Sequence, residues 1–126
     1  MHVLLAEDNP DNREMLARRL QRRGFTVDCA EDGALAVAAA NNKRPDLILM
    51  DVSMPVMSGL EATKALRAQP TTADLKIIAL TAHAMASARE ECMQAGCDAF
   101  ATKPVDFASL LETIASVTGK PLPTAA

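Results

Sequence analysis

The stretch Pro45-Asp-Leu-Ile-Leu-Met-Asp51 decides the fold of this chain, because it is an apolar run that ends in a single carboxylate. A second run, His2-Val-Leu-Leu-Ala6, ends in the acid pair Glu7 and Asp8. Nearly unbroken aliphatic runs of this length are typical of strands that are buried on both faces of a parallel sheet. If the two strands are neighbours, their carboxyl ends bring Glu7, Asp8 and Asp51 into one pocket.

Short apolar runs alternate with helical patterns along the whole chain of 126 residues. We expect strands at residues 3–7, 26–30, 47–51, 76–81 and 99–102. Helices are expected between them: Asn9-Pro10 is a typical helix start, and Ser58 with Glu61 forms a candidate capping box. Alternation of this kind indicates an α/β domain with a parallel sheet.

Five strands with five flanking helices leave few topologies open. Right-handed crossovers and burial of both sheet faces favour a doubly wound, flavodoxin-like sheet with the strand order 2-1-3-4-5. In that order the first and third strands are adjacent, and the strand order reverses between them. Ligands of such sheets bind in the crevice at the reversal, which is where the acids are expected. The predicted fold class is therefore α/β, with a doubly wound five-stranded parallel sheet.

The composition predicts a single domain with an aliphatic core. The chain is 49% hydrophobic, yet it contains only three Phe and neither Tyr nor Trp. A chain of 126 residues has room for one sheet covered on both faces and none for a second folded unit. We expect the folded domain to span residues 1–118. Residues 119–126, which contain two prolines, are expected to form a flexible tail or a linker.

Charge and cysteine content argue against several classes of function. The net charge of −3 disfavours direct nucleic-acid binding, which needs a basic surface. The three cysteines lack the CxxC spacing of zinc sites, so reduced thiols are expected. The sequence shows neither a signal peptide nor an apolar run long enough to cross a bilayer. We therefore expect a cytoplasmic location and no membrane insertion.

Three carboxylates in one pocket predict a divalent metal ion. Like charges at short range raise one another's pKa and destabilise the fold unless a cation offsets them. Mg²⁺ suits such a site, because it takes one or two carboxylates and keeps several waters, and Mn²⁺ is the alternative. We expect Asp8 and Asp51 to be direct ligands and Glu7 to bind through water. The backbone carbonyl of Ser53 is a candidate for a further ligand.

Two more expected strand ends carry a hydroxyl and an ammonium group, from Thr81 and from Lys103, which precedes Pro104. Asp51 is the acid that is delivered singly, so it is the candidate nucleophile. A carboxylate can attack phosphorus to form an acyl phosphate. The metal ion, Lys103 and Thr81 would each meet one phosphoryl oxygen. Together these groups predict a site that holds a phosphoryl group.

Two other functions fit parts of the pattern. A magnesium phosphohydrolase with an aspartate nucleophile usually needs a second acid two residues later, where this chain has Ser53. A flavodoxin-like cofactor carrier would want a phosphate loop rich in Ser, Thr and Gly, whereas residues 7–11 are acidic. Each site residue taken singly also has a structural explanation, such as Asp51 capping the following helix.

Five motifs together make residues 2 to 118 resemble a response-regulator receiver domain of two-component signalling. They are Leu4-Leu-Ala-Glu-Asp-Asn9, Pro45-Asp-Leu-Ile-Leu-Met-Asp51, Met54-Pro55 with Gly59, Ala79-Leu-Thr-Ala82 and Thr102-Lys-Pro104. The resemblance implies a CheY-like fold and a magnesium-dependent phosphoprotein switch. A histidine kinase or a histidine phosphotransfer protein would donate the phosphoryl group, and Asp51 would become an aspartyl phosphate. Such a domain is not an enzyme in the usual sense, because it catalyses only its own phosphorylation and dephosphorylation.

The resemblance also implies roles for single residues. Glu7 and Asp8 correspond to the acidic pair, Thr81 to the switch hydroxyl and Lys103 to the lysine that contacts phosphate. Phe100 lies three residues before Lys103, where the family often carries an aromatic residue that turns inward on activation. Phe lacks the hydroxyl of the commoner Tyr at this position.

Two further positions, Ser53 and His83, resemble positions that control water access in the family and hence the lifetime of the acyl phosphate. Phosphorylation is expected to reshape the surface of the fourth helix, the fifth strand and the fifth helix for a downstream protein target or an attached effector. The sequence leaves open whether the chain is a stand-alone regulator or a receiver cut from a hybrid kinase or another larger protein.

Overall fold

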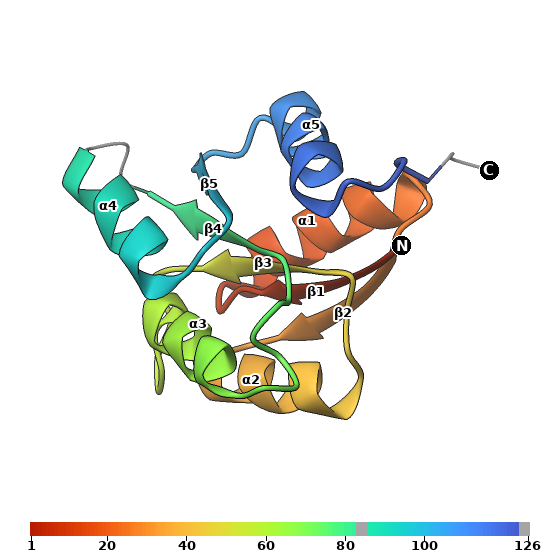
Figure 1. Ribbon diagram of the computed structural model, residues 1–126. Helices are drawn as coiled ribbons and strands as arrows, with labels where there is room; N and C mark the ends of the chain where they lie inside the picture. Colours follow the sequence, from red (N-terminus) through yellow and green to blue (C-terminus); the bar gives the residue numbers. More distant parts are fainter. Residues whose placement is uncertain (83–85, 124–126) are drawn as a thin grey trace.

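The computed structural model describes residues 1–82 and 86–123 of the chain (Figure 1). In this part, five strands alternate with five helices, as predicted. The strands are β1 (His2–Ala6), β2 (Thr26–Ala30), β3 (Leu47–Asp51), β4 (Ile77–Thr81) and β5 (Ala99–Thr102). The helices are α1 (Pro10–Arg22), α2 (Gly33–Asn42), α3 (Gly59–Ala68), α4 (Ala86–Ala95) and α5 (Phe107–Thr118).

The sheet is parallel throughout, and its strand order β2-β1-β3-β4-β5 confirms the prediction. β1 lies beside β3 with Ala6 opposite Met50, so the strand order reverses at this pair. Strand limits differ from the expected ones by one residue at β1 and at the start of β4. The backbone N–H of Glu7 still donates to the carbonyl of Ala30 at 3.0 Å, which extends the pairing past the end of β1.

Helices cover both faces of the sheet, α1 and α5 on one and α2, α3 and α4 on the other (Figure 1). Alternate strand residues point to opposite faces. Leu4 and Ala6 belong to the core cluster on the α2–α4 side, whereas Val3 and Leu5 belong to the cluster on the α1–α5 side. All residues of β3 and β4 are buried, which explains why their sequences are aliphatic runs without alternation.

Side-chain caps define the starts of the helices that lead away from the acids. The Asn9 side chain accepts the backbone N–H of Asn12 at 3.0 Å, and Pro10 is the first residue of α1. Ser58 accepts the backbone N–H of Glu61 at 3.2 Å, while the Glu61 side chain accepts the backbone N–H of Ser58 at 3.3 Å. The predicted capping box is therefore confirmed, and α3 begins directly after it.

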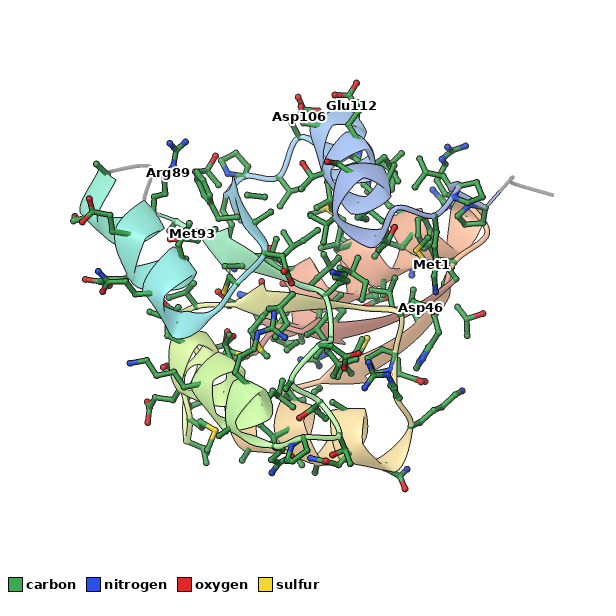
Figure 2. The ribbon with its side chains drawn as sticks, viewed as in Figure 1. Met1, Asp46, Arg89, Met93, Asp106 and Glu112 are labelled. Carbon is green, nitrogen blue, oxygen red and sulfur yellow. The ribbon has the colours of Figure 1, made fainter. Side chains whose placement is uncertain are left out.

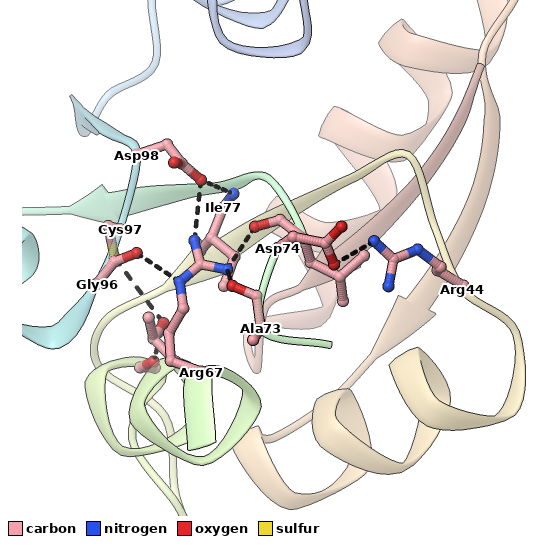
Figure 3. A network of polar contacts seen from close by, with 11 residues as sticks. Arg44, Arg67, Ala73, Asp74, Ile77, Gly96, Cys97 and Asp98 are labelled. Atoms are coloured by element: carbon pink, nitrogen blue, oxygen red, sulfur yellow. Dashed lines mark hydrogen bonds and ion pairs between the residues drawn. The ribbon is translucent and has the colours of Figure 1, made fainter. Parts of the chain in front are cut away.

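An arginine network joins α3 to the segments that precede β4 and β5, at the edge of the sheet opposite the acids (Figure 3). Arg67 donates through Nε to the carbonyl of Gly96 at 2.9 Å and through Nη1 to that of Ala73 at 3.0 Å. Its Nη2 lies 2.9 Å from Oδ2 of Asp98, which also accepts the backbone N–H of Ile77 at 2.8 Å. We refer to these contacts as the Arg67 network.

The segment after α5 makes contacts with the domain. Gly119 ends α5 in the left-handed conformation, with φ 66°. Lys120 Nζ then lies 2.6 Å from Oδ1 of Asp46, the acid labelled in Figure 2. Oδ2 of Asp46 accepts the backbone N–H of His2 at 2.8 Å. Leu122 packs against the α1–α5 side of the core. Within residues 1–82 and 86–123, no helix combines the length and the apolar character that a membrane crossing requires.

Candidate functional site

Three acids meet at the carboxyl edge of the sheet. Glu7 and Asp8 directly follow β1, and Asp51 is the last residue of β3, the neighbouring strand. One carboxylate oxygen of each acid lies within 4.8 Å of one from each of the other two. Glu7 and Asp51 are only 3% and 4% exposed, whereas Asp8 is open to solvent. Two of the acids therefore form the floor of the site, and the third lies at its entrance.

Lys103 follows the edge strand β5, and its side chain extends across the end of the sheet to the two buried acids. Its backbone N–H donates to the carbonyl of Thr81 at 2.8 Å. Its Nζ lies 2.7 Å from Oε1 of Glu7 and 3.2 Å from Oδ2 of Asp51. The peptide bond between Lys103 and Pro104 is cis. One ammonium group thus lies between two carboxyl groups that come from different strands.

Burial and mutual repulsion shape the protonation of this cluster. Desolvation by burial, together with the hydrogen bond and the charge of Glu7, raises the pKa of Asp51 to about 7, although Lys103 acts in the opposite direction. Burial also raises the pKa of Glu7, but hydrogen bonds with Asp51 and Lys103 outweigh it and lower that pKa to about 2. The pKa of Lys103 is raised, because the two acids outweigh its own burial. Of the two buried acids, Asp51 therefore keeps its proton to the higher pH.

The backbone around Asp51 is closely packed. The backbone N–H of Ser53 donates to Oδ1 of Asp51 at 3.2 Å. Gly59, the first residue of α3, lies so close that an added Cβ would collide with the carbonyl oxygen of Asp51. Its backbone N–H donates to the carbonyl of Val52 at 3.0 Å. The glycine therefore allows the start of α3 to lie directly against Asp51, which carries a buried carboxylate.

Two further predicted residues, Thr81 and Phe100, lie on β4 and β5. Thr81 ends β4 at the same edge as the acids and is 3% exposed, and it is paired in register with Thr102. Phe100 lies on β5 opposite Ala79 and is partly buried on the α2–α4 side of the sheet. His83 lies outside the described residues. The structure thus brings all predicted site residues that it describes to one end of the sheet, except Phe100, which lies further down β5.

Two arginines near these residues were not foreseen. Arg13 donates through Nη1 to the carbonyl of Glu7 at 3.0 Å and to that of Asp8 at 3.4 Å, and so fixes the turn that carries the acid pair. Arg89 of α4 lies over the ring of Phe100. Arg13 could have been suspected from its place in the first turns after the acids, but nothing local in the sequence distinguishes Arg89 from other helix-surface arginines.

The donor set favours a hard divalent cation. Carboxylate oxygens on two strands, with Asp8 still open to solvent, match the ligands that Mg²⁺ takes while it keeps part of its water shell. A cavity of about 510 Å³ lies beside the site, and of the three acids only Glu7 forms part of its wall, together with Lys103. Met15 of α1 and Val105 lie on the apolar part of the same wall. The three acids therefore offer ligands for a metal ion, whereas the cavity lies on the α1 side of Glu7 and Lys103 and is not lined by Asp51.

Comparison with known proteins identifies relatives over almost the whole chain. The family model of the response regulator receiver domain matches residues 3–115. The chain is 37% identical over 117 residues to the polar-differentiation response regulator DivK of Brucella anthropi, a match that covers 93% of this chain and 95% of DivK. It is 40% identical over 120 residues to the sensor protein GacS of Pseudomonas syringae pv. syringae, where the match covers 93% of this chain but only 13% of GacS.

A solved structure agrees with these matches. The receiver domain of the sensor histidine kinase PA1611 from Pseudomonas aeruginosa PAO1 has a TM-score of 0.88 and 39% sequence identity, and the match covers 94% of this chain and 98% of that domain. That structure has a magnesium ion coordinated in its active site cleft. Sequence and fold comparisons point the same way, and this chain belongs to the response regulator receiver domain family, which acts in two-component and phosphorelay signalling.

Proposed function

We propose that this chain is a phosphoacceptor switch in which Asp51 accepts a phosphoryl group from a histidine kinase or a histidine phosphotransfer protein. The observation that carries the proposal is the convergence of two further acids and Lys103 on Asp51, with Lys103 Nζ 3.2 Å from its carboxylate. In the transfer, an Asp51 oxygen bonds to phosphorus while the bond between phosphorus and the histidine nitrogen of the donor breaks. The donor histidine keeps the electron pair and takes up a proton.

Mg²⁺ is the expected cofactor, and Mn²⁺ would serve in its place. Asp8 and Asp51 would hold the ion directly, Glu7 would bind it through water, and the backbone carbonyl of Ser53 would add a further ligand. The ion would neutralise charge on the acids and on the entering phosphoryl group. The magnesium site of the PA1611 receiver supports this assignment, because that domain shares the fold and 39% of its residues with this chain.

Lys103 and Thr81 would stabilise the phosphoryl group once it is bound. Lys103 is already held beside Asp51, and a phosphoryl oxygen would replace part of its contact with the acids. Thr81 ends the strand next to Asp51, with Leu80 opposite Asp51 in the register, so its hydroxyl can approach a second oxygen. The chain's catalysis is limited, in this proposal, to its own phosphorylation and dephosphorylation. Ser53 would influence how easily water reaches the acyl phosphate.

The signal would pass as a shift between two packings of the same fold. Phosphorylation adds about one to two negative charges and strong acceptor oxygens, which would draw Thr81 toward Asp51. Phe100 would then turn inward and reshape the surface of α4, β5 and α5. That surface would bind a downstream protein or an attached effector, with residues 1–118 as the receiver domain and residues 119–126 as tail or linker.

Intact-mass spectrometry after incubation with acetyl phosphate and Mg²⁺ tests the proposal. We expect the unaltered protein to gain the mass of one phosphoryl group, and Asp51→Asn to gain none while remaining folded. Asp106→Asn is the matched control, because Asp106 is an exposed acid outside the site, and it should be phosphorylated normally. An undiminished adduct on Asp51→Asn would refute the assignment of the phosphoacceptor.

A further inference from the structure

We propose that Arg89, on α4, is a positioning residue for the switch. Its guanidinium group stacks on the ring of Phe100 and holds both the ring and the first half of α4 in the arrangement of the unphosphorylated protein. The inference rests on the proposed function, since that function gives Phe100 its part in transmission. It adds a second residue, from a different element, whose contact must change when Phe100 moves.

The contact itself is a cation over a ring face. The guanidinium carbon of Arg89 lies 4.7 Å from the centroid of the Phe100 ring, within the range in which a cation is attracted by the ring electrons. Arg89 is exposed, and Figure 2 shows it with Met93 along α4. Phe100 is partly buried, so one part of the ring rests on the core and the cation covers another.

Because Phe100 lacks the hydroxyl group of tyrosine, the Arg89 contact has a larger part in orienting its ring. A tyrosine at position 100 could be oriented by a hydrogen bond of its hydroxyl group, whereas the phenyl ring of Phe100 has no such group. Its position depends on packing against the core and on the charge that covers it. Arg89 therefore supplies a specific, directional contact to the ring in the resting state.

The two ends of α4 are attached to the domain very differently. Its buried residues, Cys92 and Ala95, both lie in the second half. The Arg67 network fixes the segment that follows, through Gly96 and Asp98 (Figure 3). In the first half, residues 86, 87, 89 and 90 are exposed. Within the described residues, the stacking of Arg89 on Phe100 is the specific side-chain contact that this half makes.

The carboxyl end of α4 is therefore attached through buried residues and the Arg67 network, whereas its amino-terminal half is held by the contact of Arg89 with Phe100. If Phe100 turns inward after phosphorylation, the guanidinium group loses the ring on which it lies, and the first half of α4 is released. Coupling between two sites is reciprocal at equilibrium. Loss of the Arg89 cation must therefore raise the population of the inward position of Phe100. The inference takes the inward arrangement as the one that reacts, so the rate of phosphorylation of Asp51 rises with that population.

The rate of phosphorylation from acetyl phosphate in Mg²⁺ tests this inference, followed by intact mass. We expect Arg89→Gln to be phosphorylated about two- to five-fold faster than the unaltered protein. A factor of this size corresponds to the free energy of one exposed cation–π contact. Arg89→Lys, which keeps the charge, should fall between the two. Arg44→Gln is the matched control, because Arg44 is an exposed arginine that pairs with Asp74 and is distant from the site, and it should leave the rate unchanged.

A double-mutant cycle separates coupling through the ring from a general loosening of α4. In a Phe100→Leu background the cation has no ring to cover, so adding Arg89→Gln should cause no further change in rate. In the unaltered protein, the ring-current shift of the Arg89 side-chain protons in NMR spectra should disappear on phosphorylation. Persistence of that shift after phosphorylation would overturn the inference.

The outcomes distinguish this inference from the proposed function. If the unaltered protein forms no adduct on Asp51, both fail. If the adduct forms but Arg89→Gln reacts at the unaltered rate, the inference fails alone. It also fails if Arg89→Gln speeds the reaction equally in the Phe100→Leu background, because the effect then does not pass through the ring.

Discussion

At the scale of single residues, the site is governed by the crowding of charge around Asp51. The sequence predicted that Glu7, Asp51 and Lys103 would lie at strand ends, because each directly ends or follows an apolar run. It could not show that Lys103 pairs with Glu7 at 2.7 Å across a separation of 96 residues. This pair joins the ends of β1 and β5, which are not neighbours in the sheet. Whether the two side chains meet depends on their length and direction in the folded protein.

Replacing the buried acid should stabilise the metal-free protein. We expect Asp51→Asn to raise the free energy of unfolding by about 1 to 3 kcal/mol above the pKa of Asp51, because the variant removes a buried charge that repels Glu7. The pKa of Asp51 is about 7 in the folded protein, whereas an unfolded Asp titrates near 3.9. The folded state thus holds a proton that the unfolded state has released, and the stability of the unaltered protein falls as the pH rises through this window.

Thermal unfolding in a chelator, above and below that window, measures the effect. The two proteins should be equally stable at the acidic end and should differ at the alkaline end. Added Mg²⁺ should reduce the difference, since the ion offsets the repulsion in the unaltered protein. Asp106→Asn serves as the control and should show no such pH dependence. A less stable Asp51→Asn protein at the alkaline end would contradict the charge-crowding explanation.

Lys103 should have opposite effects on metal binding and on phosphorylation. We expect Lys103→Met to tighten Mg²⁺ binding by about ten-fold, or about 1.4 kcal/mol, because it removes a positive charge beside the acids that would bind the ion. Phosphorylation should slow by about a hundred-fold, since the variant lacks the ammonium group that would meet a phosphoryl oxygen. Titration calorimetry and adduct formation measure the two effects. Weaker metal binding in the variant would contradict this role.

At the scale of helices and strands, local signals predicted most of the ends. Asn9 and Ser58 cap α1 and α3 as expected, because side-chain oxygens of these residues satisfy free backbone N–H groups. Met54, Pro55 and Gly59, one of the five motifs of the sequence, follow β3. The sequence could not predict how closely Gly59 approaches Asp51, because that distance depends on how α3 packs against the sheet.

A side chain at position 59 should disturb the site and the fold together. We expect Gly59→Ala to lower the free energy of unfolding by about 1 to 3 kcal/mol, because its Cβ meets the carbonyl oxygen of Asp51. Phosphorylation should slow as well, since Asp51 must shift. Gly119→Ala is the control: it has no atom within 4 Å of its Cβ but has a positive φ, so it reports backbone strain alone. Urea unfolding measures both, and an unchanged free energy of unfolding in Gly59→Ala would contradict the collision.

At the scale of the whole molecule, the strand order followed from simple rules. Five strands, right-handed crossovers and coverage of both sheet faces leave little choice of topology. These rules do not predict the side-chain contacts that attach the helices to neighbouring segments. Arg67 and Arg89 are surface-type residues whose partners, Asp98 and Phe100, come from β5 or the segment before it. Long-range pairs of this kind follow from the finished fold and not from any local pattern.

Thiol accessibility tests the packing of the whole fold. Cys29 is exposed on β2, whereas Cys92 and Cys97 are 1% and 5% exposed in the core. Burial also raises the pKa of Cys97 to about 11, so its reactive thiolate form is rare at neutral pH. We expect iodoacetamide to modify Cys29 alone in the native protein and all three cysteines in urea. Cys29→Ser should remain unmodified under native conditions, and rapid labelling of Cys97 there would contradict the fold.

The central claim is that a divalent ion allows Asp51, among crowded carboxylates, to take up a phosphoryl group. Locating the modified residue tests it most directly. The protein is incubated with acetyl phosphate in Mg²⁺ or in a chelator, reduced with borohydride, which converts an aspartyl phosphate to homoserine, and mapped by peptide mass spectrometry. We predict homoserine at position 51 in the Mg²⁺ sample alone. Homoserine at another acid, or equal conversion at position 51 in the chelator, would contradict the account.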